Sequence, residues 1–372
     1  MINDPDSYLT SLPKDWSRTT SSSHPSVFND GVSHMNIKSL LIGSAAALAA
    51  VSGAQAADAI VAAEPEPLEY VRVCDAFGTG FFYIPGTETC LKFGGYIRFQ
   101  TDFGRNESGS SDWDSFTRAQ FEVDTRTDTE LGALRGFIGF RGNADNGSSS
   151  SSGVHVDQAF ISLGGFTVGK IYSEWDNDLN GETDILSTNT LFNSILYTYD
   201  AGSFSATVSV DELEDTLSSK NNDVGITGVL RANLGAFSGT LVGSYDTDLE
   251  EGAIRAIVFA DVGPGTFGLA GVWASGPNAY YAESEWAVAA EYAIKATDRL
   301  TITPAAQYLG NVAPDFASNL DADWTNNDAW TAGLTVDYKI TEGLATKVTA
   351  NYYDEDGADD EVRGFVRLQR TF

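Results

Sequence analysis

The feature that most constrains this chain is a series of segments, about ten residues each, in which apolar and polar residues alternate. In the segment 91–103, Ile97 and Phe99 share one frame, whereas Arg98 and Gln100 share the other. A period of two is typical of a β-strand with one apolar and one wet face. Sixteen segments with this pattern follow one another, at 91–103, 117–126, 133–141, 154–163, 166–171, 193–200, 203–211, 224–234, 237–246, 253–261, 266–275, 285–295, 300–309, 329–340, 344–353 and 362–372.

The connections between these segments alternate between short turns and longer polar loops. The short turns lie at 127–132, 164–165, 201–202, 235–236, 262–265, 296–298 and 341–343. Such asymmetry is typical of a bacterial outer-membrane barrel, whose closure leaves no unpaired strand edge in lipid. A soluble β-sandwich would explain the alternation but not the asymmetry. The sequence therefore predicts an all-β fold, a 16-stranded antiparallel transmembrane β-barrel over residues 91–372.

The composition narrows the possible functions. The formal net charge of the 372 residues is −30, which argues against nucleic acid as a partner because two polyanions repel each other. We find no glycine-rich phosphate loop and no nucleophilic serine motif, and His155 has no obvious catalytic partner. We therefore predict that the protein is not an enzyme and has no cofactor.

Two acidic stretches, 246–252 and 354–361, could hold Ca²⁺ through oxygen ligands. Neither has the full spacing of an EF-hand, and we interpret both as solvated loops on the long-loop side. Bridging of lipopolysaccharide by divalent ions is the alternative. We predict no metal site.

The N-terminal residues are not predicted to belong to the barrel. Residues 35–56 carry one lysine, an apolar run and a small-residue cleavage site, which is the pattern of a secretory signal peptide. We interpret 1–34 as a non-native or untranslated extension, with translation starting at Met35 and the mature chain at Ala57. A genuine extended leader is the alternative.

Residues 57–90 form a lead-in that contains Cys74 and Cys90, the only cysteines of the chain. In an oxidising compartment such a pair most simply forms one disulfide. A metal site built on two cysteines lacks further ligands in this sequence.

Three stretches resemble the alphaproteobacterial (Rhizobiales-type) general porins. They are EYVRVCDAFGTGFFYIPGTETCLKFGGYIR at 69–98, AFISLGGFTVGK at 159–170 and GFVRLQRTF at 364–372. The resemblance implies a homotrimeric outer-membrane porin whose third external loop folds into the lumen. It also implies that Phe372 is the C-terminal aromatic residue read by the barrel-assembly machinery. The chain departs from the family pattern in its 34-residue prefix and in some short loops.

The segment 171–192 is the candidate for this inward-folded loop, since it is acidic and contains no lysine or arginine. Its acidic residues are Glu174, Asp176, Asp178, Glu182 and Asp184. We expect them to narrow the lumen of the barrel.

The arginines that fall in the polar frame of the strands form the second candidate site. Arg98, Arg118, Arg135 and Arg367 are predicted near the middles of consecutive strands, and Arg141 shares their frame. We expect a basic wall opposite the acidic loop, with a transverse field between them that disfavours apolar solutes. Ordinary solvated lumen arginines are the alternative interpretation.

The predicted function is that of a general diffusion porin in the bacterial outer membrane. It would pass small hydrophilic solutes and ions passively, with mild cation preference, while in contact with outer-membrane lipid and lipopolysaccharide. Two alternatives remain open: an adhesin or structural barrel with a closed lumen, and an outer-membrane hydrolase.

Overall fold

The computed structural model describes residues 71–145, 153–214, 216, 223–314 and 323–372. The predicted extension 1–34 and signal peptide 35–56, with the first part of the lead-in, lie outside the described residues. No helix in the described ranges is long and apolar enough to cross a membrane.

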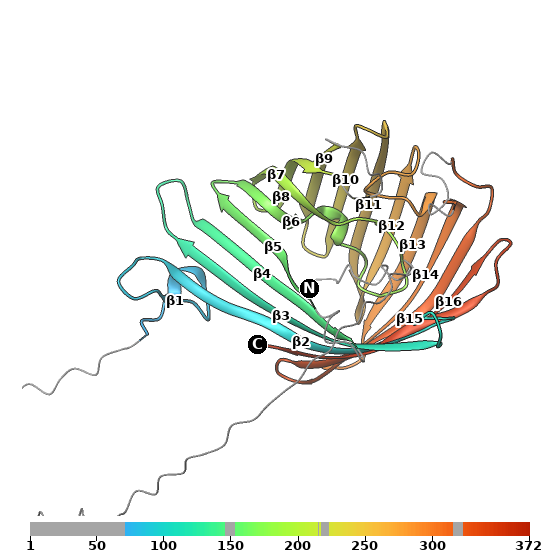
Figure 1. The fold of residues 1–372 in the computed structure, drawn as a ribbon, viewed down its shortest axis with the longest axis horizontal. Helices are drawn as coiled ribbons and strands as arrows, with labels where there is room; N and C mark the ends of the chain where they lie inside the picture. The colour runs from blue at the N-terminus through green and yellow to red at the C-terminus, as the bar shows by residue number, and fades with distance from the viewer. Residues whose placement is uncertain (1–70, 146–152, 215, 217–222, 315–322) are drawn as a thin grey trace, which may run out of the picture. The chain divides into compact units, whose positions relative to one another are not determined.

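Sixteen long strands of the described chain form one antiparallel sheet that closes on itself, because β17 pairs with β2 (Figure 1). The strands are β2 (Cys90–Phe103), β3 (Trp113–Thr127), β4 (Leu134–Asp145), β5 (Val154–Leu163), β6 (Phe166–Tyr172), β7 (Leu191–Asp200), β8 (Phe204–Glu212), β9 (Val224–Asn233), β10 (Phe237–Asp246), β11 (Glu251–Val262), β12 (Gly265–Ala274), β13 (Ser284–Lys295), β14 (Leu300–Val312), β15 (Ala329–Thr341), β16 (Leu344–Glu355) and β17 (Glu361–Thr371). The predicted closed barrel is confirmed. Several strands extend beyond their predicted ends, and β3 begins at Trp113 rather than at position 117.

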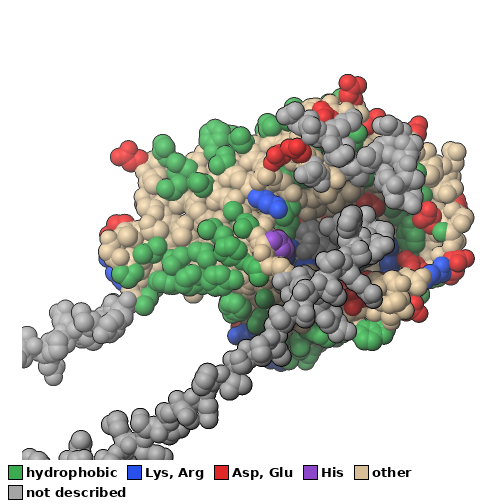
Figure 2. All heavy atoms as spheres, in the orientation of Figure 1, with side chains coloured by type: hydrophobic (Ala, Val, Ile, Leu, Met, Phe, Trp, Pro, Cys, Tyr) green, Lys and Arg blue, Asp and Glu red, His purple; other side chains and the backbone are tan. Residues whose placement is uncertain are grey.

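The two faces of the sheet differ as the alternation predicts. On β2, Ile97 and Phe99 are 52% and 51% exposed, whereas Arg98 and Gln100 on the other face are 4% and 5% exposed. Hydrophobic side chains form a broad patch on the outer surface over the region of β2–β4 (Figure 2). This arrangement suits a barrel whose outer solvent is lipid and whose interior is polar.

The main hydrophobic cluster lies on the inner side of the sheet. It joins side chains of two connections, 173–190 after β6 and 275–283 after β12, to inward-facing residues of the wall. Trp175, Leu179, Tyr280 and Tyr281 are fully buried there. The two connections thus fold back onto the inner face of the barrel instead of extending from its rim.

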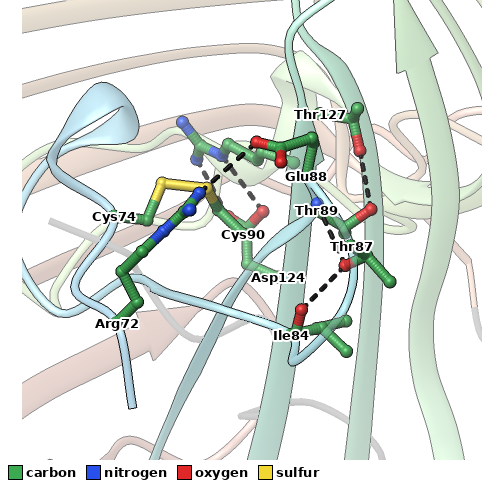
Figure 3. The surroundings of a disulfide bond; sticks show 10 residues. Arg72, Cys74, Ile84, Thr87, Glu88, Thr89, Cys90, Asp124 and Thr127 are labelled. Carbon is green, nitrogen blue, oxygen red and sulfur yellow. Dashed lines mark hydrogen bonds and ion pairs between the residues drawn. A yellow bond between two sulfur atoms is a disulfide. The ribbon is translucent and has the colours of Figure 1, made fainter. Parts of the chain in front are cut away.

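The cysteines form the predicted disulfide, with Cα atoms 6.0 Å apart (Figure 3). Cys74 precedes a short 3₁₀ turn, η2 (Asp75–Phe77), and Cys90 begins β2. Together with Phe81 they form a small separate core. The two-residue strand β1 (Phe82–Tyr83) pairs with the start of β2, so the lead-in is fastened to the barrel wall.

The chain ends where the barrel closes. The backbone N–H of Phe372 donates to the carbonyl oxygen of Gly95 at 3.1 Å, and the Phe372 residue is 57% exposed. Gly95 has φ 146°, and a Cβ there would lie 2.1 Å from the carbonyl oxygen of Gln120. Glycine is therefore required at this point of the seam.

Candidate functional site

The acidic segment 173–190 begins with a one-turn helix, η3 (Glu174–Asp176), that is anchored by a tryptophan. The hydroxyl of Ser173 accepts a hydrogen bond from the backbone N–H of Trp175 and caps this turn. The indole Nε1–H of Trp175 donates to the hydroxyl of Ser244 on β10 at 2.8 Å. A buried indole N–H needs a hydrogen-bond partner, so this contact fixes the position of the turn against β10.

Arg255 on β11 contacts the segment from the inner face of the barrel and is 1% exposed. Its two terminal nitrogens donate to five acceptors: the carbonyl oxygens of Glu174 (2.6 Å), Trp175 (3.1 Å), Asn177 (2.9 Å) and Leu186 (3.2 Å), and the carboxylate of Asp178 (2.8 Å). Its fixed fork of donors is suited to satisfying several carbonyl groups at once. Arg255 therefore ties both arms of the segment to one strand.

Glu291 on β13 holds the tip of the segment. Its carboxylate accepts from the backbone N–H of Asn180 (2.8 Å), the side-chain amide of Asn180 (2.6 Å) and the backbone N–H of Gly181 (2.7 Å). Gln307 on β14 pairs with both backbone groups of Ile185, at 2.7 and 2.6 Å. These contacts replace the hydrogen bonds that the buried backbone would otherwise lack.

The last strands hold the far side of the tip. The backbone N–H of Glu182 donates to the hydroxyl of Thr335 at 3.0 Å, and its carbonyl accepts from the amide of Asn351 at 2.9 Å. The Glu182 carboxylate lies 2.6 Å from Lys347 Nζ and 4.0 Å from Arg367. Among the ion pairs of the described residues, Glu182 is the one of the five predicted acidic residues that pairs with strands β16 and β17.

The other four acidic residues have different surroundings. Glu174 forms an ion pair with Arg231. Asp178 pairs with Arg255 at 2.8 Å. Burial, with a contribution from the charge of Asp178, raises the pKa of Asp176 to about 7. Burial also raises the pKa of Asp184 well above its usual range. The segment therefore carries less net charge into the lumen than its sequence indicates.

Four arginines lie side by side on adjacent strands and form what we call the basic wall: Arg98, Arg118, Arg141 and Arg367. Arg98 is directly opposite Arg118 in the register of β2 and β3. Arg141 also lies 3.2 Å from Asp157 on β5. Of the arginines predicted to align, Arg98, Arg118 and Arg367 lie on consecutive strands, and Arg141, predicted only to share their face, lies beside them on β4.

The predicted position of Arg135 near the middle of its strand is wrong. Arg135 is the second residue of β4 and pairs with Arg126, next to the short turn that joins β3 and β4. Both guanidinium groups contact the carboxylate of Asp124, at 3.0 and 2.9 Å. Alternation identifies the face on which an arginine lies, but its height depends on the turn register, which pairs 126 with 135.

The connection 275–283 was not predicted to contribute to the site. The hydroxyl of Tyr280 donates to Asp211 on β8 at 2.8 Å, and its ring packs against Phe192 with centroids 5.3 Å apart. The backbone N–H of Thr188 donates to the carbonyl oxygen of Tyr280 at 3.0 Å. The amide of Asn189 donates to the carbonyl oxygen of Ala279 at 2.8 Å. This connection therefore lies between the barrel strands near β8 and the acidic segment.

A cavity of about 910 Å³ lies beneath the acidic segment, toward the short turns of the barrel. Asp178, Asn180, Arg231, Lys295 and Lys347 are among its lining residues. Charged groups of both signs therefore face the same polar space. Among the described residues, no group of His, Cys, Asp and Glu side chains has an arrangement that could hold a metal ion.

Comparison with known proteins agrees with this architecture. Residues 58–367 match the family described as the porin subfamily. The chain is 54% identical to an outer membrane protein of Sinorhizobium fredii over 91% of its own length and 99% of that protein. It is 35% identical to the porin Omp2b of Brucella neotomae over 91% and 100% of the two chains. Among solved structures, the outer membrane channel DcaP of Acinetobacter baumannii superposes with a TM-score of 0.60 at 13% identity, covering 78% and 99% of the two chains.

Proposed function

Because this chain belongs to the porin subfamily and is an outer-membrane β-barrel protein, we propose that it is a general diffusion porin. It forms a passive, water-filled channel for small hydrophilic solutes and ions. A closed sheet of sixteen strands is wide enough to enclose an aqueous channel, whereas about eight strands would be filled by side chains.

The observation that carries the proposal is the seating of the acidic segment on the polar inner face of the sheet. Its hydrogen bonds go to Arg255, Glu291, Gln307, Thr335 and Asn351, which lie on strands β11 to β16. The basic wall lies on β17, β2, β3 and β4. The segment therefore narrows the channel from the side of β11 to β16, and its tip reaches the edge of the basic wall at Arg367.

Opposed charges across such a constriction would select solutes by charge and polarity. The field between carboxylates and guanidinium groups is stronger in a narrow, partly dehydrated passage than in bulk water. A solute must exchange its hydration for these groups, so apolar solutes are disfavoured. The net charge of −30 favours cations at the mouths, and the basic wall opposes this effect. The resulting cation preference is mild.

We further propose a homotrimer embedded in outer-membrane lipid and lipopolysaccharide. The exposed apolar face of the strands supplies the surface for lipid and for neighbouring subunits. Phe372 closes the last strand on that face, where the barrel-assembly machinery would read it.

The test is single-channel conductance of the purified protein in a planar bilayer. Steps that scale with salt concentration and close in groups of three support an open trimeric channel. A correctly folded barrel without conductance would refute the proposal in favour of an adhesin or structural barrel with a closed lumen.

A further inference from the structure

We propose that Gln369 and Asn143 are positioning residues of the channel. They hold the guanidinium groups of Arg98 and Arg118 apart and so fix the charge of the basic wall in place. This inference rests on the proposed function, because the basic wall matters for selection only if solutes pass it.

A short pattern recurs on the strands of the basic wall. Three strands carry an aromatic residue, an arginine and a glutamine at alternate positions: YIRFQ at 96–100, FTRAQ at 116–120 and FVRLQ at 365–369. The fourth strand carries GFRGN at 139–143, with asparagine in place of glutamine and glycine in place of the aromatic residue. Residues at alternate positions of a strand share one face, so each pattern places all its members on the inner face.

The register of the sheet brings arginines and amides together. Four pairs are directly opposed across neighbouring strands: Arg98 with Gln369, Arg367 with Gln100, Arg118 with Asn143, and Arg141 with Gln120. In each pair the guanidinium Nε–H donates to the amide oxygen, at 2.8, 2.5, 2.8 and 2.9 Å respectively. The same contact is thus made four times across two strand boundaries, twice between β17 and β2 and twice between β3 and β4.

The central pair shows what these contacts achieve. Arg98 and Arg118 are directly opposed, a position in which Cβ atoms lie about 5 Å apart and like charges destabilise the sheet. The two Nε–H groups donate in opposite directions, toward Gln369 on β17 and toward Asn143 on β4. The amides therefore draw the two guanidinium groups away from each other.

Aromatic rings support the same orientation. The guanidinium carbons of Arg98, Arg118 and Arg367 lie 4.9, 5.1 and 4.2 Å from the ring centroids of Tyr96, Phe116 and Phe365. Each ring is two residues before its arginine on the same strand. A guanidinium held on one face by a ring and at Nε by an amide loses most of its rotational freedom.

The contrast with Asp124 supports a role for neutral partners. Near the short turns, Arg126 and Arg135 are paired with the Asp124 carboxylate at 2.9 and 3.0 Å. Such a pair holds the side chains but cancels part of their charge. At the Nε positions of the basic wall the partner is a neutral amide, which holds the guanidinium group without itself adding a negative charge.

The experiment measures the position and the effect of Arg98 separately. Nitrogen-15 NMR of the full chain in nanodiscs reports water exchange of the arginine Nε–H groups, and Arg98→Lys identifies the signal. In Gln369→Ala the Nε–H of Arg98 should exchange about tenfold faster, because it loses a charge-assisted hydrogen bond. In Gln369→Glu the Nε–H should stay protected, whereas the chloride-to-potassium permeability ratio should fall about twofold because the variant adds a carboxylate beside Arg98.

The matched control is Gln158→Ala on β5, because Gln158 lies opposite Gly139, which has no side chain to hold. It should leave the Arg98 signal unchanged. Unchanged exchange in Gln369→Ala would overturn the positioning role whether or not the protein conducts. If the protein does not conduct but Gln369→Ala loses protection, the positioning role stands and the proposed channel function fails.

Discussion

The contact between Glu291 and the tip of the acidic segment offers a quantitative prediction. Glu291→Gln replaces one carboxylate oxygen with an NH₂ group, which cannot accept from the backbone N–H of Asn180 or Gly181. At least one of three hydrogen bonds is lost, and those that remain are no longer charge-assisted. A hydrogen bond to a charged group contributes about 1.5 to 3 kcal/mol, so seating of the tip should weaken by about 2 to 4 kcal/mol.

Hydrogen exchange of the backbone amides, followed by mass spectrometry, measures this change. If the tip exchanges by local opening, 2 to 4 kcal/mol corresponds to exchange roughly 30-fold to 1,000-fold faster over 178–186. Amides of the strands should exchange as before, because Glu291 makes its contacts with the segment and the sheet ladder does not depend on its side chain.

The control is Glu285→Gln, on the same strand and the same face. Glu285 accepts from the side chain of Asn311 at 2.5 Å and, among the described residues, forms no hydrogen bond or ion pair with the acidic segment. It should leave exchange at 178–186 unchanged. Equal exchange in the wild type and Glu291→Gln would refute the reasoning, as would equal acceleration in both variants.

Three further predictions concern the rest of the site and the lead-in. Tyr280→Phe removes the hydrogen bond to Asp211 on β8 and should raise the frequency of brief current fluctuations in single-channel recordings. The control is Tyr308→Phe, at an exposed tyrosine that donates to an aspartate at 2.6 Å, and it should not change this frequency. Equal fluctuation frequencies in the two variants would contradict a role of Tyr280 in holding the acidic segment. Because the pKa of Asp176 is raised to about 7, this carboxylate gains a proton as pH falls from 8 to 6, and cation preference in reversal-potential measurements should weaken over that range; a flat profile would exclude a role for Asp176. Replacing Cys74 and Cys90 together by serine should destabilise the lead-in by about 3 kcal/mol, seen as faster proteolysis at 71–90, while the thermal unfolding of the barrel is unchanged; a lower barrel melting temperature would show that the disulfide supports the wall.

The barrel could be predicted from the sequence because lipid imposes a simple rule on every strand. Ile97 and Phe99 must face outward and Arg98 inward, so period-two alternation is enough to predict the strands and the barrel that they form. The height of a residue along its strand cannot be predicted from alternation. Arg135 shares the frame of Arg118 but lies near the short turn, because the register that pairs it with Arg126 is a property of two strands and the turn between them.

The seating of the acidic segment could not be predicted in the same way. Its partners, such as Arg255 and Glu291, are single residues far away in sequence, and nothing in their local pattern distinguishes them from other polar residues of the inner face. The connection 275–283 resembles an ordinary polar loop until its tyrosines are found buried. The repeated aromatic, arginine and glutamine pattern was visible in the sequence, but its meaning depends on which strands become neighbours.

The contacts of the acidic segment also order the events of assembly. Asn180 is 111 residues from Glu291, Glu182 is 153 from Thr335, and Thr183 is 168 from Asn351. None of these bonds can form until β13, β15 and β16 are in place, and contacts of such long range form late because the intervening chain must first be ordered. A sheet that stopped short of these strands would leave the segment unseated. A seated segment therefore indicates that the strands it contacts are already in place.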